Sequence, residues 1–173
     1  MILGEQHEIL YNDAWAATER LKDDDSQTNR RALVHAVSAY IEGSASGLRQ
    51  STLETDDDLH VLTEGDRYML LDRGYRLDDR GNVLESNTYQ PFKNTLLFTF
   101  VSFAKVFGLK YKVDLSTSGW AAMRRFVELR NRMTHPKSAA DLECSYDDIT
   151  DTRDAFEWFH NVIVDISKNI PDV

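Results

Sequence analysis

Apolar residues recur every three or four positions along most of this chain of 173 residues, which is the spacing of one face of an α-helix. The clearest stretch lies near the C-terminus, where Ile149, Phe156, Ile163 and Ile170 follow one another in heptad spacing. The range 92–109 is apolar nearly all round, so we expect that helix at the centre of a bundle. The periodicity predicts helices over six residue ranges: 2–22, 29–53, 63–72, 92–109, 116–134 and 145–170.

Polar residues predict where several of these helices begin and end. Proline disfavours helical geometry in the residue before it, so Pro136 should end the fifth predicted helix and Pro171 the last one. Ser, Thr and Asp residues just before a periodic stretch are typical of helix N-caps. N-caps are therefore expected at Thr63, at Ser116 or Ser118, and at Ser145.

A few stretches depart from the helical pattern. Tyr75–Glu85 alternates apolar and polar residues around an Asp-Arg-Gly-Asn sequence, which predicts a small hairpin or extended loop. The acidic runs at 23–25 and 56–58 are expected to be solvated loops, with a turn over 52–58. Gly43 and Gly47 indicate either a close approach of another backbone or a kink in the second helix.

These elements together predict an all-α fold. We expect a bundle-like domain of four long helices plus one short helix and a small hairpin or loop insert. The sequence contains no internal repeat and no linker, so a single domain over residues 1–173 is expected, with its insert at about 59–91.

Composition and charge narrow the classes of function. The formal net charge of −9 argues against a general nucleic-acid coat protein. The single cysteine, Cys144, excludes an intrachain disulfide and fits a reducing, cytoplasmic location. No signal peptide is recognisable, and the longest apolar run, 95–109, is too short to span a bilayer, so no membrane partner is expected. No metal-ligand spacing and no phosphate-binding glycine loop occurs, so no cofactor is expected.

A local excess of positive charge lies in residues 120–140, which contain five cations and one acid. At its centre is the segment Arg130–Pro136, with the sequence RNRMTHP. Arginine offers a planar, charged fork to phosphate oxygens, and histidine can transfer a proton near neutral pH. An ideal helix separates Arg130 from His135, but the chain unwinds before the proline, and a second copy could also bring the two residues together. The same residues can cap carbonyls or pair with acids, and spacing alone favours that structural role.

The arginine, the polar residue after it and the histidine resemble the Arg-x4-6-His signature of the HEPN superfamily (higher eukaryotes and prokaryotes nucleotide-binding). The order of the helices around this motif, and the hairpin insert, are also similar to that family, so the resemblance covers most of the chain. It implies a metal-independent endoribonuclease of the toxin–antitoxin or other defence type. In such an enzyme the 2'-hydroxyl of RNA attacks the phosphodiester in a cleft formed by a homodimer.

The resemblance also implies roles for individual residues. Arg130 would contact the scissile phosphate, His135 would act as general acid or base or bind phosphate, and Asn131 would orient one of them. Some family members carry a tyrosine two residues after the histidine, which a nucleotidyltransferase modifies; Lys137 occupies that position here, which argues against such regulation. The RNA backbone would be held by flanking cations: Arg124, Arg125, Arg132 and Lys137.

Three hypotheses follow from the sequence. The first is a dimeric ribonuclease, and the second is a non-catalytic module that binds nucleotide, nucleic acid or a partner such as an antitoxin or nucleotidyltransferase. The third is a structural dimer, in which Arg130 and His135 make interface or capping bonds. An open basic cleft across a two-fold axis would favour the first. Arg130 buried against an acid, with His135 packed away from it, would favour the third.

Overall fold

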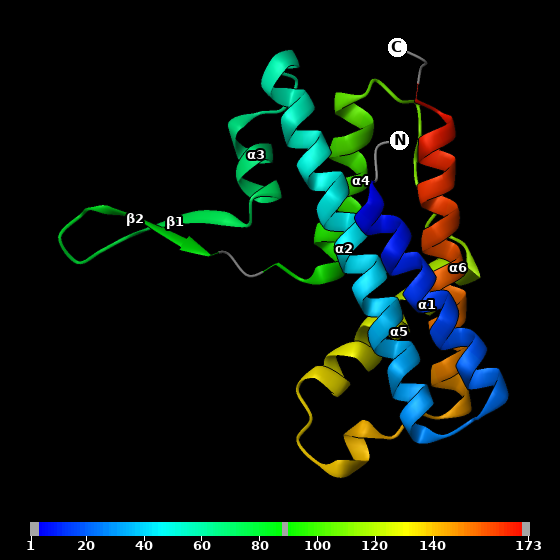
Figure 1. Ribbon diagram of the computed structural model, residues 1–173. Helices are drawn as coiled ribbons and strands as arrows, with labels where there is room; N and C mark the ends of the chain where they lie inside the picture. Colours follow the sequence, from blue (N-terminus) through cyan, green and yellow to red (C-terminus); the bar gives the residue numbers. More distant parts are fainter. Residues whose placement is uncertain (1–3, 88–89, 171–173) are drawn as a thin grey trace. The chain divides into compact units, whose positions relative to one another are not determined.

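The computed structural model describes residues 4–87 and 90–170, and its helices confirm the all-α fold class (Figure 1). Five helices of the described residues have at least fifteen residues each, one more than the expected four, because every long periodic segment forms a helix of its own. Residues 2–3 of the first predicted helix, and the stop at Pro171, lie outside the described residues. The elements are α1 Glu5–Asp23, α2 Gln27–Leu59, α3 Glu64–Leu70, β1 Arg73–Leu77, β2 Val83–Asn87, α4 Phe92–Val106, α5 Ser118–Thr134, the 3-10 helix η1 Ala139–Leu142, and α6 Tyr146–Lys168.

The chain divides into two compact units, and each is described separately. The first unit comprises Met1–Gly47 and Val113–Asn169, and the second comprises Leu48–Lys112 and Ile170–Val173. The expectation of a single domain stays a prediction.

In the first unit, α5 packs along α6 over a core of aromatic residues. The ring of Tyr40 meets those of Phe156 and Phe159 edge-on, at centroid distances of 5.2 and 5.5 Å. Gly119 lies against Trp158, so closely that a Cβ on the glycine would lie 2.7 Å from the Cβ of the tryptophan. This packing fixes α5, the helix that carries the basic segment.

The helix caps agree with the sequence at two of three positions. Thr63 and Ser145 each form a capping box with the acid three residues later, as predicted. The cap of α5, however, is Thr117, whose hydroxyl accepts a hydrogen bond from the Trp120 N–H at 3.2 Å. Neither of the two predicted N-caps, Ser116 and Ser118, caps the helix. The hydroxyl of Ser116 donates to Asp114 at 2.7 Å, and Ser118 is the first residue inside the helix.

The second half of α2 contradicts two expectations. The predicted turn at 52–58 is helical. Asp56 in this stretch is 1% exposed, not solvated. Its carboxylate accepts hydrogen bonds from the N–H groups of Val61 and Leu62, both at 2.7 Å, and from Arg67 at 2.6 Å. Because these donors satisfy the carboxylate, the acid can be buried and can hold the end of the helix.

The surroundings of Gly43, in the first half of α2, bear on the two interpretations of its glycines. The helix continues without interruption through Gly43 and Gly47. A Cβ on Gly43 would collide with the Cδ1 atom of Leu10 in α1. The glycine therefore accommodates a side chain of the neighbouring helix, not its backbone, and the alternative of a kink stays a prediction.

The second unit contains the predicted hairpin. β1 and β2 pair antiparallel, with Gly74 opposite Ser86, and the Asp78 carboxylate fixes the turn by accepting the N–H groups of Arg80 and Asn82, both at 2.8 Å (Figure 1). In the same unit α3 packs against α4 over Leu62, Leu70 and Val106.

The helix α4 is less enclosed than its composition predicts. Val101 is 64% exposed, and Lys105 four residues later is also exposed, so one stripe of α4 faces solvent. The lysine ion-pairs with Asp66 of α3 at 2.9 Å.

Candidate functional site

The solvent-facing ridge of α5 carries part of the predicted site. Arg124, Glu128, Asn131 and His135 are all exposed. They are spaced by four, three and four residues, and at about 100° per residue this spacing places them along one line. Arg130 lies five residues before His135 and thus about 140° round the helix axis from that line. The ridge therefore holds the amide and the imidazole, whereas the arginine lies on a different, partly buried side of the helix.

The helix ends where the sequence predicts. The last helical residue is Thr134, and its hydroxyl donates to the Arg130 carbonyl at 2.8 Å. His135 is the C-cap, with a non-helical φ of −126° and ψ of 58°, and its N–H donates to the Asn131 carbonyl at 3.1 Å. Because Pro136 follows, the imidazole is carried on backbone that has already left the helix.

The guanidinium of Arg130 is bonded on two sides. It donates to the Asn131 side-chain oxygen at 2.9 Å and, through its other terminal nitrogen, to the Glu42 carboxylate of α2. The same oxygen of Glu42 accepts the Ser38 hydroxyl at 2.9 Å. The Arg130 and Glu42 side chains remain 27% and 39% exposed, so the pair is accessible from solvent.

Glu42 is the site residue that the sequence analysis missed. It lies 88 residues before Arg130, inside a helix whose polar face offers several acids. Only its spacing of four residues from Ser38 marks it locally, and that spacing is common on helices. The pair thus meets one condition of the structural hypothesis, an arginine against an acid, although the arginine is not buried.

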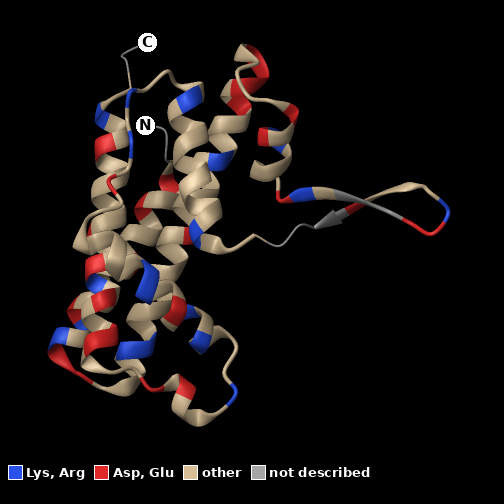
Figure 2. Cartoon of the chain, turned by 180° about the vertical axis from the view of Figure 1, so that it is seen from behind, with Lys and Arg blue, Asp and Glu red and all other residues tan. Residues whose placement is uncertain are grey.

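Two of the flanking arginines that were predicted to bind RNA form ion pairs with carboxylates of α6. Arg125 makes a bidentate pair with Asp151 at 2.7 and 2.6 Å. Arg132 donates to Asp148 at 3.1 Å and to the Glu143 carbonyl at 3.0 Å. In Figure 2 both acidic and basic residues occur along the helices.

The remaining two predicted cations, Arg124 and Lys137, are exposed, and neither has an ion-pair partner in the described part of the chain. Lys137 lies in the loop after α5, where its N–H donates to the Asp141 carboxylate at 2.8 Å. This bond, together with two from Ser138, lowers the pKa of Asp141 despite some desolvation.

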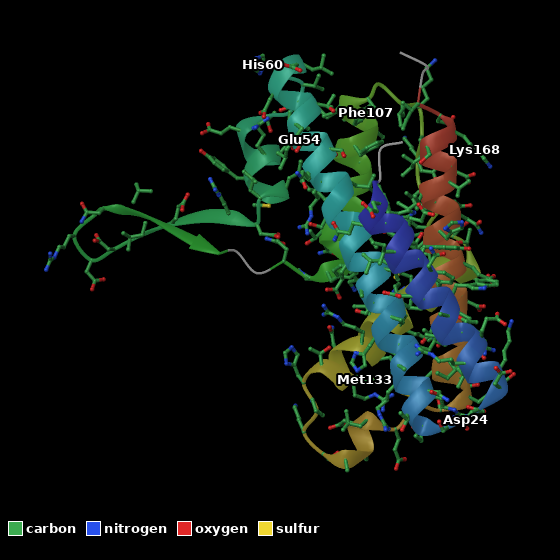
Figure 3. The ribbon with its side chains drawn as sticks, in the orientation of Figure 1. Asp24, Glu54, His60, Phe107, Met133 and Lys168 are labelled. Carbon is green, nitrogen blue, oxygen red and sulfur yellow. The ribbon has the colours of Figure 1, made fainter. Side chains whose placement is uncertain are left out.

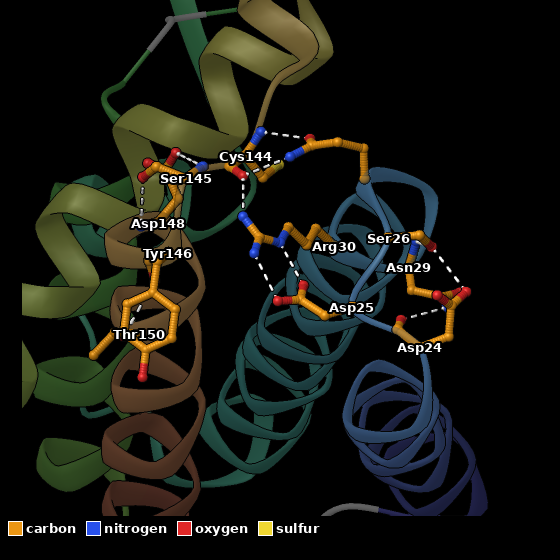
Figure 4. Close-up of polar contacts among 11 residues, drawn as sticks. Asp24, Asp25, Ser26, Asn29, Arg30, Cys144, Ser145, Tyr146, Asp148 and Thr150 are labelled. Carbon is orange, nitrogen blue, oxygen red and sulfur yellow. Dashed lines mark hydrogen bonds and ion pairs between the residues drawn. The ribbon is translucent and has the colours of Figure 1, made fainter.

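The loop between α5 and α6 is held by the beginning of α2 (Figure 4). Gln27 makes a reciprocal pair with the backbone of Cys144, both bonds being 2.9 Å. Arg30 donates to the same carbonyl at 2.8 Å while binding both oxygens of Asp25. The Cys144 thiol is buried against the sulfur of Met133, which Figure 3 labels near the end of α5, and burial raises the pKa of this thiol. The Cys144 end of the loop that follows His135 is thus anchored on α2.

The described residues contain no group of three or more His, Cys, Asp or Glu side chains placed to hold a metal ion. None of their helices combines the length and the apolar character needed to cross a membrane. Comparison of the chain with family models, curated proteins and solved structures found no match.

Proposed function

We propose that this protein is a metal-independent endoribonuclease, as its resemblance to the HEPN superfamily implies, and that Arg130, Asn131 and His135 form its reactive face. The observation that supports this most is the oriented and accessible guanidinium of Arg130, bonded to Asn131 and Glu42, on the same helix whose C-cap is the exposed His135. Preorganised, partly exposed donors of this kind are what a phosphate oxygen requires.

In the proposed reaction, His135 removes the proton of the ribose 2'-hydroxyl or delivers one to the departing 5'-oxygen. The 2'-oxygen attacks phosphorus, the bond to the 5'-oxygen breaks, and a 2',3'-cyclic phosphate and a 5'-hydroxyl result. Arg130 would stabilise the charge that develops on the phosphate oxygens, and Glu42 would act as a positioning residue that fixes the guanidinium. A homodimer would supply a second copy of the motif and bring the imidazole of one chain to the arginine of the other.

The paired arginines change which residues we propose for RNA binding. Arg125 and Arg132 would have to leave Asp151 and Asp148 before they could bind phosphate. Arg124 and Lys137 would not, so we assign the backbone contacts to these two first.

The test is cleavage of a single-stranded RNA by the purified full chain in EDTA. We expect Arg130→Ala to lower the cleavage rate by about 10²–10³ and His135→Ala by about 10²–10⁴. Glu42→Ala should lower kcat more than it raises KM. His35→Ala and Arg20→Ala, which change exposed residues elsewhere in the first unit, are the matched controls. Cleavage that survives both Arg130→Ala and His135→Ala would refute the proposal.

A second candidate is a non-catalytic helical module, and the carboxylate partners of Arg125, Arg130 and Arg132 favour it. In that case these arginines would only tie α5 to α2 and α6. Wild-type protein would then leave RNA intact, and Arg130→Ala would reduce stability by no more than about 1 kcal/mol, since the ion pair is partly exposed.

A further inference from the structure

Two histidines of the first unit lie outside the α5 site and are half-buried. Nδ1 of His7 in α1 shares a hydrogen bond of 2.8 Å with the Ser44 hydroxyl, and Nδ1 of His160 in α6 shares one of 3.0 Å with the Tyr40 hydroxyl. Ser44 and Tyr40, both in α2, are 1% and 0% exposed. Because Ser44 is closed to a substrate, its bond to a histidine does not make it a nucleophile.

Aromatic rings join the two hydrogen bonds into one cluster. Tyr11 lies 4.8 Å from His160 between ring centroids, and Tyr40 lies 5.2 Å from His7. Tyr11 also stacks on Phe156 at 5.6 Å. The cluster therefore links α1 to both α2 and α6.

No negative charge faces these imidazoles among the described residues. Their hydrogen-bond and ring partners are Tyr11 from α1, Tyr40 and Ser44 from α2, and Phe156 from α6. The nearest acid along α2 is Glu42, and its carboxylate bonds to Arg130 and Ser38. A proton on either histidine would thus enter a half-buried site in which none of these protein partners carries a negative charge.

The pKa values follow from this environment. Burial lowers the pKa of His7, and the nearby His160 lowers it further. Burial also lowers the pKa of His160. Because both groups stay neutral more readily in the folded chain, their contribution to stability is fully present above the ordinary histidine pKa of about 6.5 and is lost as the pH falls below it.

The first half of α1 is the part of this cluster that is held least firmly by other contacts. Its N-cap, Gly4, provides no side-chain hydrogen bond to the first turn. The fully buried residues of α1, Ala14, Ala17 and Leu21, all lie in its second half. The first half therefore depends on His7 and its neighbours for much of its attachment.

We propose that the first half of α1 is an acid-released latch: neutral His7 and His160 hold it on α2 and α6, and their protonation releases it from Tyr40 and Ser44. The release is local, because the second half of α1 keeps its buried alanines and leucine. It uncovers Tyr40 and Ser44 without unfolding the unit.

Hydrogen exchange of the full chain tests this inference. Protection factors of the α1 amides at 8–12 are compared with those of α6 at 155–163, at about pH 7.5 and about pH 5.5. Each group whose pKa is one unit lower in the closed form than in the open form makes opening up to about tenfold easier, once the pH lies below both values. We expect the α1 amides to lose protection about tenfold or more, while α6 stays protected.

The double variant His7→Gln/His160→Gln should remove the pH dependence, because its amides can bond Ser44 and Tyr40 but do not titrate. His35→Gln, which changes an exposed histidine of α2, should retain it. NMR titration of the wild-type imidazoles provides a second measurement if the double variant does not fold. Unchanged α1 protection in acid, equal loss in α6, or imidazole pKa values at or above 6.5 would each overturn the proposal.

Discussion

Replacing Gly119 with alanine should destabilise the protein, although helix propensity predicts the opposite. Alanine is favoured over glycine in a helix by up to about 1 kcal/mol. The added Cβ, however, would lie 2.6, 2.7 and 2.8 Å from Cδ1, Cβ and Cγ of Trp158. The Cβ of the tryptophan moves only with the backbone of α6, so rotation of its ring cannot relieve the contact. Overpacking of this kind costs about 1–3 kcal/mol, and we expect a net loss of about 1–2 kcal/mol.

Gly65→Ala is the matched control, because Gly65 is the second residue of α3 as Gly119 is of α5. Its added Cβ would have only the Thr63 hydroxyl near it, at 3.9 Å, so we expect stabilisation by about 0.4–1 kcal/mol. Urea denaturation followed by circular dichroism and by tryptophan fluorescence gives both free energies of unfolding. If Gly119→Ala raised the denaturation midpoint as Gly65→Ala does, the close packing of α5 on α6 would be refuted.

Three further predictions concern stability. Phe159→Ala should lower the free energy of unfolding by about 3–5 kcal/mol, because the ring is fully buried; a loss below about 1 kcal/mol in urea would contradict that burial. Burial acts to raise the pKa of Asp56, but the Leu62 N–H, Arg67 and the Val61 N–H lower it overall, so its stabilisation is lost as the pH falls through the lowered value. The melting temperature should therefore fall more between about pH 5 and pH 3 in the wild type than in Asp56→Asn, and parallel curves would exclude this role. Arg125→Ala should change stability by less than about 1 kcal/mol in the same denaturation assay, because the Arg125 side chain is 56% exposed even though that of Asp151 is only 17% exposed, and a larger loss would show that the pair is structural.

The sequence predicted the helices well where the apolar period and a local cap agree. Ser145 caps α6 and Thr134 ends α5 because an N-cap and a proline act within a few residues of themselves. It failed at 52–58, where a run of acids indicated a turn. Arg67 and two backbone N–H groups, which follow the helix in sequence, satisfy the carboxylate of Asp56, and no local rule shows that they return to it.

In the candidate site, too, the sequence could predict local features but not the partners that come from other helices. Its helix end and the exposure of His135 follow from neighbouring residues, so the sequence could predict them. The partner of Arg130 is on α2, and those of Arg125 and Arg132 are on α6. A count of charges between 120 and 140 finds five cations and one acid, but it cannot include carboxylates that folding brings from other helices.

These partners alter the electrostatic argument for the basic segment. A cation that already binds a carboxylate adds little net field, so the segment 120–140 attracts a polyanion less than its sequence implies. Arg130 differs from Arg125 in how the donors of its guanidinium are distributed between partners. Arg125 is held on both oxygens of Asp151, whereas Arg130 divides its donors between Glu42 and the neutral amide of Asn131. A phosphate can replace the amide without breaking the ion pair, so the guanidinium could bind substrate while Glu42 continues to orient it. For the proposed ribonuclease, this arrangement predicts that the segment Arg130–Pro136 would act on one phosphate rather than bind a long stretch of nucleic acid.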